Sequence, residues 1–392
     1  MKIFRSGRRF FAALVAAGAL LGGGASALLG ICGPFTDVSD PAFCPFVLEI
    51  FYLGLTTGTT PTTYDPASSV SRLQMAAFLS RSVDGVVRRV SRRAALQQFW
   101  TPQNGLTLGL TTLPGTGAIK SDGADLWVVD GGGFNTVSRV RGSDGKQLET
   151  WTGAGQASQV LVAMGRVFVT GYFPGASMLY RLDPGLPAGA VTTIATDLGS
   201  QSQGLTFDGT RIWTANLGLP ASVSIVTPAA SLPWPVTTVT TGFGAPVSTL
   251  YDGANVWVTD IMTGTLLKLN GSGAILQTVT LGGNPLSLAF DGANLWVATY
   301  LTNSVWVVRA STGAVLATLT GNGLSGPGGV SFDGQRVLVT DETAPGVSLW
   351  KAADLTPLGF SSTGAGTGPT SSCRDGINFW VVLSGTSQLA RF

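Results

Sequence analysis

A recurring pattern of short apolar runs and polar turns fills most of the chain. Its clearest copy is Asn284–Tyr300, in which two β-rich runs flank an Asp-Gly turn. Copies aligned on this Asp follow one another at about 42 residues, the length of a four-stranded propeller blade. The pattern predicts an all-β fold, a seven-bladed β-propeller of four-stranded blades. The seven anchors are Asp122, Ala163, Asp208, Asp252, Asp291, Asp333 and Asp375.

One column of the repeat is aromatic. Five residues after the anchors stand Trp127, Phe168, Trp213, Trp257, Trp296, Leu338 and Trp380. A tryptophan column of this kind suits packing between neighbouring blades, so we expect it in the core rather than in a ligand-stacking ring. The Asp-Gly pairs are interpreted as turns, because glycine takes the positive φ that a tight hairpin requires. Six residues before four of the anchors, prolines set the start of a strand: Pro246, Pro285, Pro327 and Pro369.

The last copy ends after its third strand, at Gln388–Phe392. A matching segment, Leu106–Thr112, precedes the first anchor. We expect it to supply the missing fourth strand, which closes the ring and removes a free sheet edge.

These repeats resemble YVTN/NHL-type β-propellers over Gln103–Phe392. The resemblance is carried by Phe290–Thr299, Asn303–Val308 and Thr312–Thr318. Such propellers include streptogramin-lyase relatives, whose activity depends on histidine. This chain contains no histidine.

The start of the chain has the pattern of a secretory signal peptide. A basic segment, Met1–Arg9, precedes an apolar run, Phe10–Leu21, and the small residues Ala25-Ser26-Ala27, so we expect cleavage after Ala27. The run is too short for a membrane span, and no later segment is long enough. The sequence therefore predicts an exported protein, in the cell envelope, periplasm or extracellular space. Arg8-Arg9 leaves the twin-arginine route open beside the general one.

Residues 28–85 form a predicted helix–loop–helix module. Phe43–Leu53 is a helix-like apolar stretch, and Ser71 with Gln74 is a capping box before a second helix whose apolar stripe is Met75, Phe78 and Leu79. Cys32 and Cys44 flank a short turn-rich stretch and are the natural disulfide pair of an exported chain. Residues 86–102 then form a basic helical linker with four arginines along one side.

This module resembles a single S-layer homology (SLH) domain. The matching residues are Phe35–Val38, Leu53-Gly54, Gly58, Tyr64–Pro66 and Val70–Gln74. The resemblance implies non-covalent anchoring to cell-envelope polysaccharide, with Arg72 in the place of the arginine that the family turns toward its anionic polymer. Gln74 stands where the family has glutamate, and one copy is visible where wall-anchored proteins usually carry three. The alternative of a small structural cap without polymer binding stays open.

The amino-acid composition excludes several kinds of catalytic and metal-binding site. The absence of histidine excludes Ser-His-Asp triads, Cys-His dyads and His-ligated metals. Charged residues make up 11% of the chain and the formal net charge is +2, with basic residues concentrated near the start, so nucleic acid is not an expected partner. Cys373 falls on a predicted inner strand and is expected to be a buried, inert thiol.

Candidate ligand-binding residues lie eight positions after the anchors, where a loop begins on one face of the disc. This column is Asp130, Gly171, Asn216, Asp260, Thr299, Asp341 and Leu383. Its three carboxylates fall in blades that are not neighbours, so convergence on one metal is not expected, and capping of the loop backbone is the simpler interpretation. Tyr300, with Phe134, Tyr172 and Phe173, could stack a sugar or peptide there, and Asp341-Glu342 is the adjacent acidic pair.

No catalytic residue, metal site or cofactor is assigned from the sequence. The favoured hypothesis is an exported, envelope-associated binding or scaffold protein, whose propeller binds an unidentified protein, peptide or glycan. The alternative is an exported hydrolase or lyase that uses the face's carboxylates on glycan or peptide, since glycosidases need only two acids.

Overall fold

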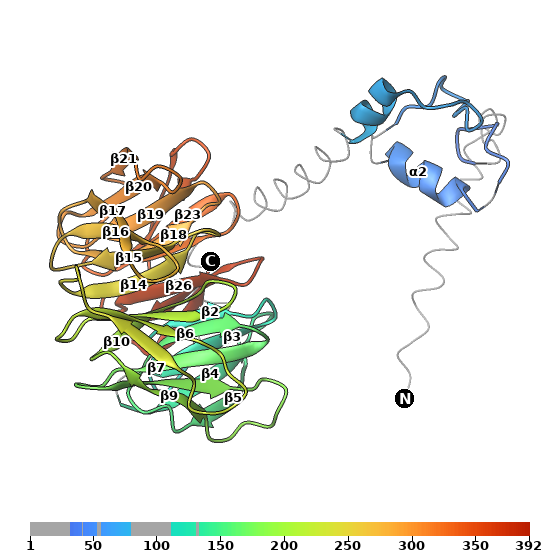
Figure 1. Ribbon diagram of the computed structural model, residues 1–392. Coiled ribbons are helices and arrows are strands. Elements are labelled where there is room, and N and C mark those ends of the chain that lie inside the picture. The colour runs from blue at the N-terminus through green and yellow to red at the C-terminus, as the bar shows by residue number, and fades with distance from the viewer. Residues whose placement is uncertain (1–31, 41, 53–55, 80–110, 131–132) are drawn as a thin grey trace. The chain divides into compact units, whose positions relative to one another are not determined.

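The structure, a computed structural model, describes residues 32–40, 42–52, 56–79, 111–130 and 133–392. The chain divides into two compact units, Met1–Phe99 and Trp100–Phe392 (Figure 1), and each is described by itself. The predicted signal peptide and the predicted basic linker 86–102 lie outside the described residues. Among the described residues, no helix is both long and apolar enough to cross a membrane.

The second unit is an all-β, seven-bladed propeller of four-stranded antiparallel sheets, as the repeat predicts (Figure 1). Blade 1 consists of β2 (Ile119–Ser121), β3 (Asp125–Asp130), β4 (Thr136–Arg141) and β5 (Gln147–Thr152), and blade 2 of β6 (Ala157–Ala163), β7 (Arg166–Gly171), β8 (Ser177–Leu182) and β9 (Thr192–Leu198). Blade 3 consists of β10 (Ser202–Phe207), β11 (Ile212–Asn216), β12 (Ser222–Val226) and β13 (Val236–Val239), and blade 4 of β14 (Pro246–Tyr251), β15 (Val256–Asp260), β16 (Thr265–Leu269) and β17 (Ile275–Thr280).

Blade 5 consists of β18 (Pro285–Phe290), β19 (Asn294–Thr299), β20 (Ser304–Arg309) and β21 (Val315–Leu319). Blade 6 consists of β22 (Pro327–Phe332), β23 (Arg336–Asp341), β24 (Gly346–Lys351) and β25 (Pro357–Ser362). Blade 7 consists of β26 (Pro369–Arg374), β27 (Phe379–Leu383), β28 (Gln388–Arg391) and β1 (Thr111–Thr112). The four prolines singled out in the sequence each begin the first strand of a blade.

The ring closes between the two ends of the propeller sequence. β1 pairs antiparallel with β28, with Thr111 opposite Leu389 and Thr112 opposite Gln388. The predicted closing strand is therefore confirmed at Thr111–Thr112, and Leu106–Leu110 lies outside the described residues. Because the fourth strand of blade 7 comes from the other end of the sequence, strand pairing holds the circle together.

The tryptophan column lies in the core, as predicted. Trp127, Trp213, Trp257, Trp296 and Trp380 are fully buried. Trp127 packs with Val160 and Val167 of the following blade, so these side chains join neighbouring sheets. Each buries an area on the order of 150–250 Å², which makes the inter-blade packing a major source of stability.

The anchor aspartates have a role that the sequence did not reveal. In blade 4, one carboxylate oxygen of Asp252 accepts the backbone N–H groups of Ala254 (2.8 Å) and Asn255 (2.7 Å), and the other accepts the indole N–H of Trp257 (2.7 Å). Gly253 takes φ +97°, as the Asp-Gly turn predicts. The same indole contact recurs in the pairs Asp122–Trp127, Asp208–Trp213, Asp291–Trp296 and Asp375–Trp380.

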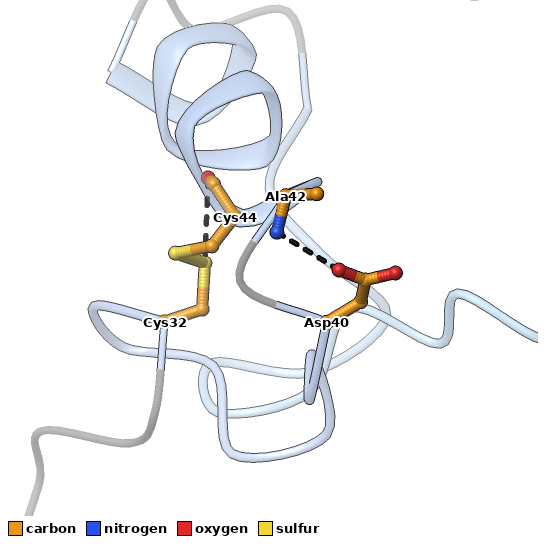
Figure 2. Close-up of a disulfide and its surroundings, with 4 residues drawn as sticks. All are labelled: Cys32, Asp40, Ala42 and Cys44. Carbon is orange, nitrogen blue, oxygen red and sulfur yellow. Dashed lines mark hydrogen bonds between the residues drawn. A yellow bond between two sulfur atoms is a disulfide. The ribbon is translucent and has the colours of Figure 1, made fainter.

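The first unit contains helix α2 (Cys44–Tyr52), close to its predicted span, and a second helix over residues 72–79. The predicted disulfide joins Cys32 and Cys44, with their Cα atoms 5.5 Å apart (Figure 2). Asp40 precedes the helix, and its carboxylate accepts the N–H of Ala42 at 2.8 Å (Figure 2). Phe35 fills a small core with Cys32, Val38 and Val47.

The predicted capping box is present at the second helix. The Ser71 hydroxyl accepts the N–H of Gln74 (3.2 Å), and the Gln74 side-chain oxygen accepts the N–H of Ser71 (2.8 Å). Of the predicted apolar stripe, Met75 and Leu79 remain exposed. Helix formation thus follows the local signal, and most of the apolar stripe is exposed.

Candidate functional site

Two sets of loops meet at one end of the propeller. Antiparallel blades place the loop between the second and third strands at the end where the chain enters the next blade. Backbone hydrogen bonds join these loops, as from Ile261 N–H to the carbonyl of Ala245 (3.0 Å) and from Tyr300 N–H to that of Asn284 (2.9 Å). We call this end the upper face and the opposite end the lower face.

The predicted ligand-binding column closes the second strand of each blade, directly beneath the upper face. The candidates Asp130, Asn216, Asp260 and Asp341 lie at equivalent positions in blades 1, 3, 4 and 6, and all are buried. They do not converge on one point, in agreement with their spacing. Their partners are mostly groups of their own blade's loops and third strand.

Asp260 illustrates what this position does. Its carboxylate accepts three backbone N–H groups: Gly244 (2.7 Å) and Ala245 (3.0 Å) in the loop entering blade 4, and Thr263 (3.1 Å) in the loop between β15 and β16. One buried carboxylate therefore fixes two adjacent upper-face loops against each other. Such charge-assisted bonds stabilise by about 1.5–3 kcal/mol each when a buried donor would otherwise be left unpaired.

Asn216 has an equally complete set of partners. Its amide nitrogen donates to the hydroxyls of Ser222 (3.0 Å) and Ser224 (2.9 Å), and its oxygen accepts the hydroxyls of Thr214 (2.9 Å) and Ser202. The side chain therefore has no remaining capacity for a ligand without losing a bond to the blade.

Asp341 lies in a setting that favours its protonated form. Burial raises its pKa to about 7, against the bonds from Ser348 and the N–H of Ser325. The Ser348 hydroxyl lies 2.6 Å from the Asp341 carboxyl and 2.9 Å from the carbonyl oxygen of Asn322. A single hydroxyl proton cannot serve both acceptors, whereas a protonated Asp341 donates to Ser348 and satisfies all three groups.

Burial also raises the pKa of Asp130, whose partners are the hydroxyls of Thr136 (2.7 Å) and Ser138 (2.9 Å).

Tyr300, the remaining candidate of the propeller, is half-buried at the upper face and lies against Gly326 of the next blade. Arg72 belongs to the first unit, where it is exposed in the first turn of the second helix. Ligand binding by these residues remains a prediction.

Charge is distributed unequally between the two faces. Among the described residues of the upper-face loops, Glu342 carries the single formal charge. The lower-face loops contain Asp122, Asp144, Lys146, Asp183, Asp208, Arg211, Asp252, Asp291, Asp333, Asp354 and Asp375. The sequence holds this signal, but it becomes visible only when the loops are sorted by strand pairing.

The upper-face loops, which carry little charge, also expose apolar side chains. The loops after the second strands of blades 1, 3, 4 and 5 present Phe134, Leu219, Met262 and Leu301, which are 52%, 81%, 73% and 66% exposed. Blade 2 contributes Tyr172 and Phe173 at the equivalent loop, both half-buried. A large uncharged surface with protruding apolar groups is typical of an interaction site.

A groove of about 610 Å³ crosses this face over blades 3 and 4. Its lining includes Leu217, Leu219, Ile261 and Met262, together with Gly244 and Ala245, whose backbone N–H groups donate to Asp260. The candidate carboxylate thus holds part of the groove's lining in place. Sequence analysis did not predict the groove, because its walls come from loops more than forty residues apart.

The first strands of all seven blades line a central channel of about 600 Å³. Its described lining combines serine, threonine, glutamine and glycine with valine, leucine, isoleucine and alanine, and its charged residues are Lys120 and Glu342. Glu342 follows the second strand of blade 6 and so lies at the upper mouth, and burial raises its pKa. Among the described residues, no cluster of three or more Cys, Asp or Glu side chains could hold a metal.

Cys373, on β26, is buried, and burial raises the pKa of its thiol to about 12. The thiolate is therefore scarce at neutral pH, and the sequence-based prediction of an inert cysteine agrees with this position.

Comparison with known proteins shows the fold. No family model matches the chain, and no curated protein matches its sequence. Solved propellers are similar at 14–15% identity. They include a streptogramin B lyase (15% identity, TM-score 0.59, covering 72% of this chain and 95% of that one) and the WD40 propeller domain of Doa1 (14%, 0.58, 72% and 93%).

A third similar structure is an inactive variant of virginiamycin B lyase from Staphylococcus aureus with quinupristin (15% identity, TM-score 0.61, covering 72% of this chain and 97% of that one). These likenesses place the second unit in the class of seven-bladed β-propellers, a fold that hosts both enzymes and binding modules.

Proposed function

We propose that the protein is exported and associated with the cell envelope, where its propeller is a binding or scaffold disc for a protein, peptide or glycan. The observation that carries the proposal is the use of the column's polar side chains. The side chains of Asp260 and Asn216 make their hydrogen bonds to groups of the propeller itself, whereas the loops above them present an uncharged groove. This arrangement suits binding better than catalysis.

Export is supported by two independent features. Residues 1–27 have the pattern of a signal peptide, and Cys32 forms a disulfide with Cys44. Disulfides persist mainly in oxidising compartments outside the cytosol. Fractionation of the producing cells tests this part: recovery with the envelope or the medium is expected, and recovery wholly in the cytoplasm would overturn it.

The anchoring role is proposed for the first unit. Its SLH-like residues are structurally interdependent: the Asp37 carboxylate accepts the N–H groups of Tyr64 (2.8 Å) and Asp65 (2.6 Å), which lowers the pKa of Asp37. A Cβ at Gly58 would lie 2.6 Å from the Phe35 ring, so the glycine is required there. Arg72 lies exposed in the first turn of the helix that follows these residues.

Sedimentation of the full chain with purified envelope polysaccharide tests the anchor. Arg72→Ala is expected to reduce the bound fraction, because the exposed guanidinium would face an anionic polymer. Arg141→Ala removes an exposed arginine from the propeller's third strand and is the matched control. Equal binding of both variants and the native chain would leave the first unit as a structural cap.

A hydrolase acting on glycan or peptide is the second candidate, favoured by one observation. Asp341, with a pKa of about 7, adjoins Glu342, whose carboxyl lines the channel mouth. A carboxyl that holds its proton near neutrality can act as a general acid. Turnover assays with glycan and peptide substrates decide the matter: activity in the native chain that is lost in Asp341→Asn or Asp260→Asn supports the enzyme, and no turnover removes it.

A further inference from the structure

We propose that the upper-face groove binds an extended, apolar peptide segment of a partner protein, and that this segment carries one basic side chain placed at Glu342. The inference rests on the proposed binding function and specifies its face and its ligand class. Three properties of the face lead to it: its apolar walls, its lack of charge and the isolated carboxylate at the channel mouth.

The walls fit apolar side chains. Leu219 and Met262 are 81% and 73% exposed, and they line a groove of about 610 Å³. Flexible methionine and leucine side chains adapt to apolar residues of varied shape. Burying either of them against a partner removes apolar area from water and favours association.

A glycan fits the same groove less well. Sugar hydroxyls require several directed polar partners, and among the described residues that line the groove the polar side chains are Ser200 and Gln201. The Ser200 hydroxyl already accepts the N–H of Gly175 at 3.1 Å, and Asp260 is fully buried against backbone N–H groups. Leucine and methionine also offer no flat ring on which a sugar could stack.

Charge complementarity specifies the basic side chain. Glu342 carries the single formal charge of the described upper-face loops, and it is half-buried beside Gly328 at the channel mouth. A lysine or arginine brought to this position would pair with a carboxylate that is partly removed from water. An acidic segment would be repelled, and a basic nucleic-acid-binding surface is absent from these described loops.

The groove and the channel are lined by neighbouring segments of the chain. Gln201 and Ala245 line the groove, and two residues further along the chain Gln203 and Val247, on β10 and β14, line the channel. An extended peptide advances about 3.3 Å per residue, so a segment of several residues can reach from the groove toward the mouth. A second copy of this chain is a poorer occupant, because face-to-face pairing would bring two Glu342 carboxylates toward one axis.

Defined peptides test the inference on the full chain. A set of labelled nonapeptides built from Leu, Phe, Met, Ser and Gly would contain one Lys, with matched sets in which Gln or Glu replaces that Lys. Binding is measured by fluorescence anisotropy. We expect members of the Lys set to bind about tenfold more tightly than their Gln counterparts and the Glu set to bind least.

Substitutions test which residues of the upper face contact the peptide. Glu342→Gln is expected to abolish the preference for Lys over Gln while keeping the apolar binding, and Leu219→Ser with Met262→Ser is expected to weaken all binding at least tenfold. Leu276→Ser, on the outer strand β17 and 57% exposed, is the matched control and should change nothing. Thermal unfolding of each variant verifies that the propeller is intact.

The inference is wrong if no peptide binds below 1 mM, if Glu peptides are preferred, or if the Leu219 and Met262 substitutions leave binding unchanged. Neutral oligosaccharides are tested in parallel. Oligosaccharide binding that those two substitutions abolish, without peptide binding, would overturn the peptide assignment and leave the proposed binding disc standing. Failure of the proposed function itself would appear separately, as cytoplasmic recovery in fractionation.

Discussion

The buried carboxylate of Asp260 lies 2.7 Å from the backbone nitrogen of Gly244, and this hydrogen bond ties part of the lining of the upper-face groove to the end of strand β15. Two further backbone N–H groups use the same carboxylate. Asp260 is therefore best understood as a positioning residue for the loops, and its removal should affect stability and groove shape together.

Asp260→Ala is expected to lower the free energy of unfolding by about 3 kcal/mol, because it leaves buried N–H groups without an acceptor. Asp260→Asn keeps one oxygen and should cost less. Urea denaturation measures both. Asp197→Ala, at an exposed aspartate of β9, is the matched control and should stay within about 0.5 kcal/mol of the native chain. A loss no larger than this control's would contradict the role assigned to Asp260.

Trp257→Phe separates the indole hydrogen bond from ring burial. It removes the bond to Asp252 and should lower the free energy of unfolding by about 2 kcal/mol. Trp151 is also buried, yet its indole N–H has no hydrogen-bond partner. Trp151→Phe should therefore cost clearly less. Equal losses in the two variants, measured by urea denaturation, would mean that ring packing alone accounts for the tryptophan column.

The raised pKa of Asp341, about 7, predicts how stability changes with pH. The folded state holds this proton more tightly than the unfolded chain, whose ordinary pKa is 3.8. The stabilisation is thus complete below about pH 4 and is lost as pH rises through 7, a change on the order of 4 kcal/mol. Asp130 and Glu342, whose pKa values are also raised, change in the same direction.

Asp341→Asn should remove Asp341's share of this decline, since the amide cannot ionise and Asn216 already occupies the equivalent position in blade 3. Thermal unfolding at pH 5 and pH 8 gives the comparison: the variant should gain stability relative to the native chain at pH 8. Asp354→Asn, at an exposed lower-face residue whose pKa is lowered to about 2, should show no such gain. Equal behaviour of both variants would contradict a protonated Asp341.

Loss of the disulfide should act on the first unit alone. Cys32 and Cys44 lie in a core cluster of their own, which contains no propeller residue. Replacing both with serine is expected to destabilise this unit by about 2–3 kcal/mol, through the larger freedom of its unfolded chain. Calorimetry should show an unchanged propeller transition, and limited proteolysis should cut the first unit faster. A lowered propeller transition would show that the two units are coupled.

Much of the fold was predictable because its signals are local or periodic. The spacing of Trp257 from Asp252 repeats in four other blades. Ser71 and Gln74 are three residues apart, and Cys32 is twelve residues from Cys44. Each of these relations requires only the chain's own geometry.

The candidate site was harder to predict because it depends on how neighbouring blades pack against each other. Leu219 and Met262 are separated by more than forty residues and become neighbours of one groove only when blades 3 and 4 are packed. The sequence placed Asp341 at the start of a loop, but its raised pKa comes from burial, which becomes visible only in the packed blade. The sequence likewise could not show that the column points beneath the loops.

The claim that the upper face is the binding surface is tested most directly by photo-crosslinking in the producing cells. The full chain would carry p-benzoylphenylalanine in place of Met262 and, in a separate variant, in place of Leu276 on the outer strand. The account predicts a discrete crosslinked species from position 262 that is absent from position 276. No crosslink at 262, or the same species from both positions, would contradict it.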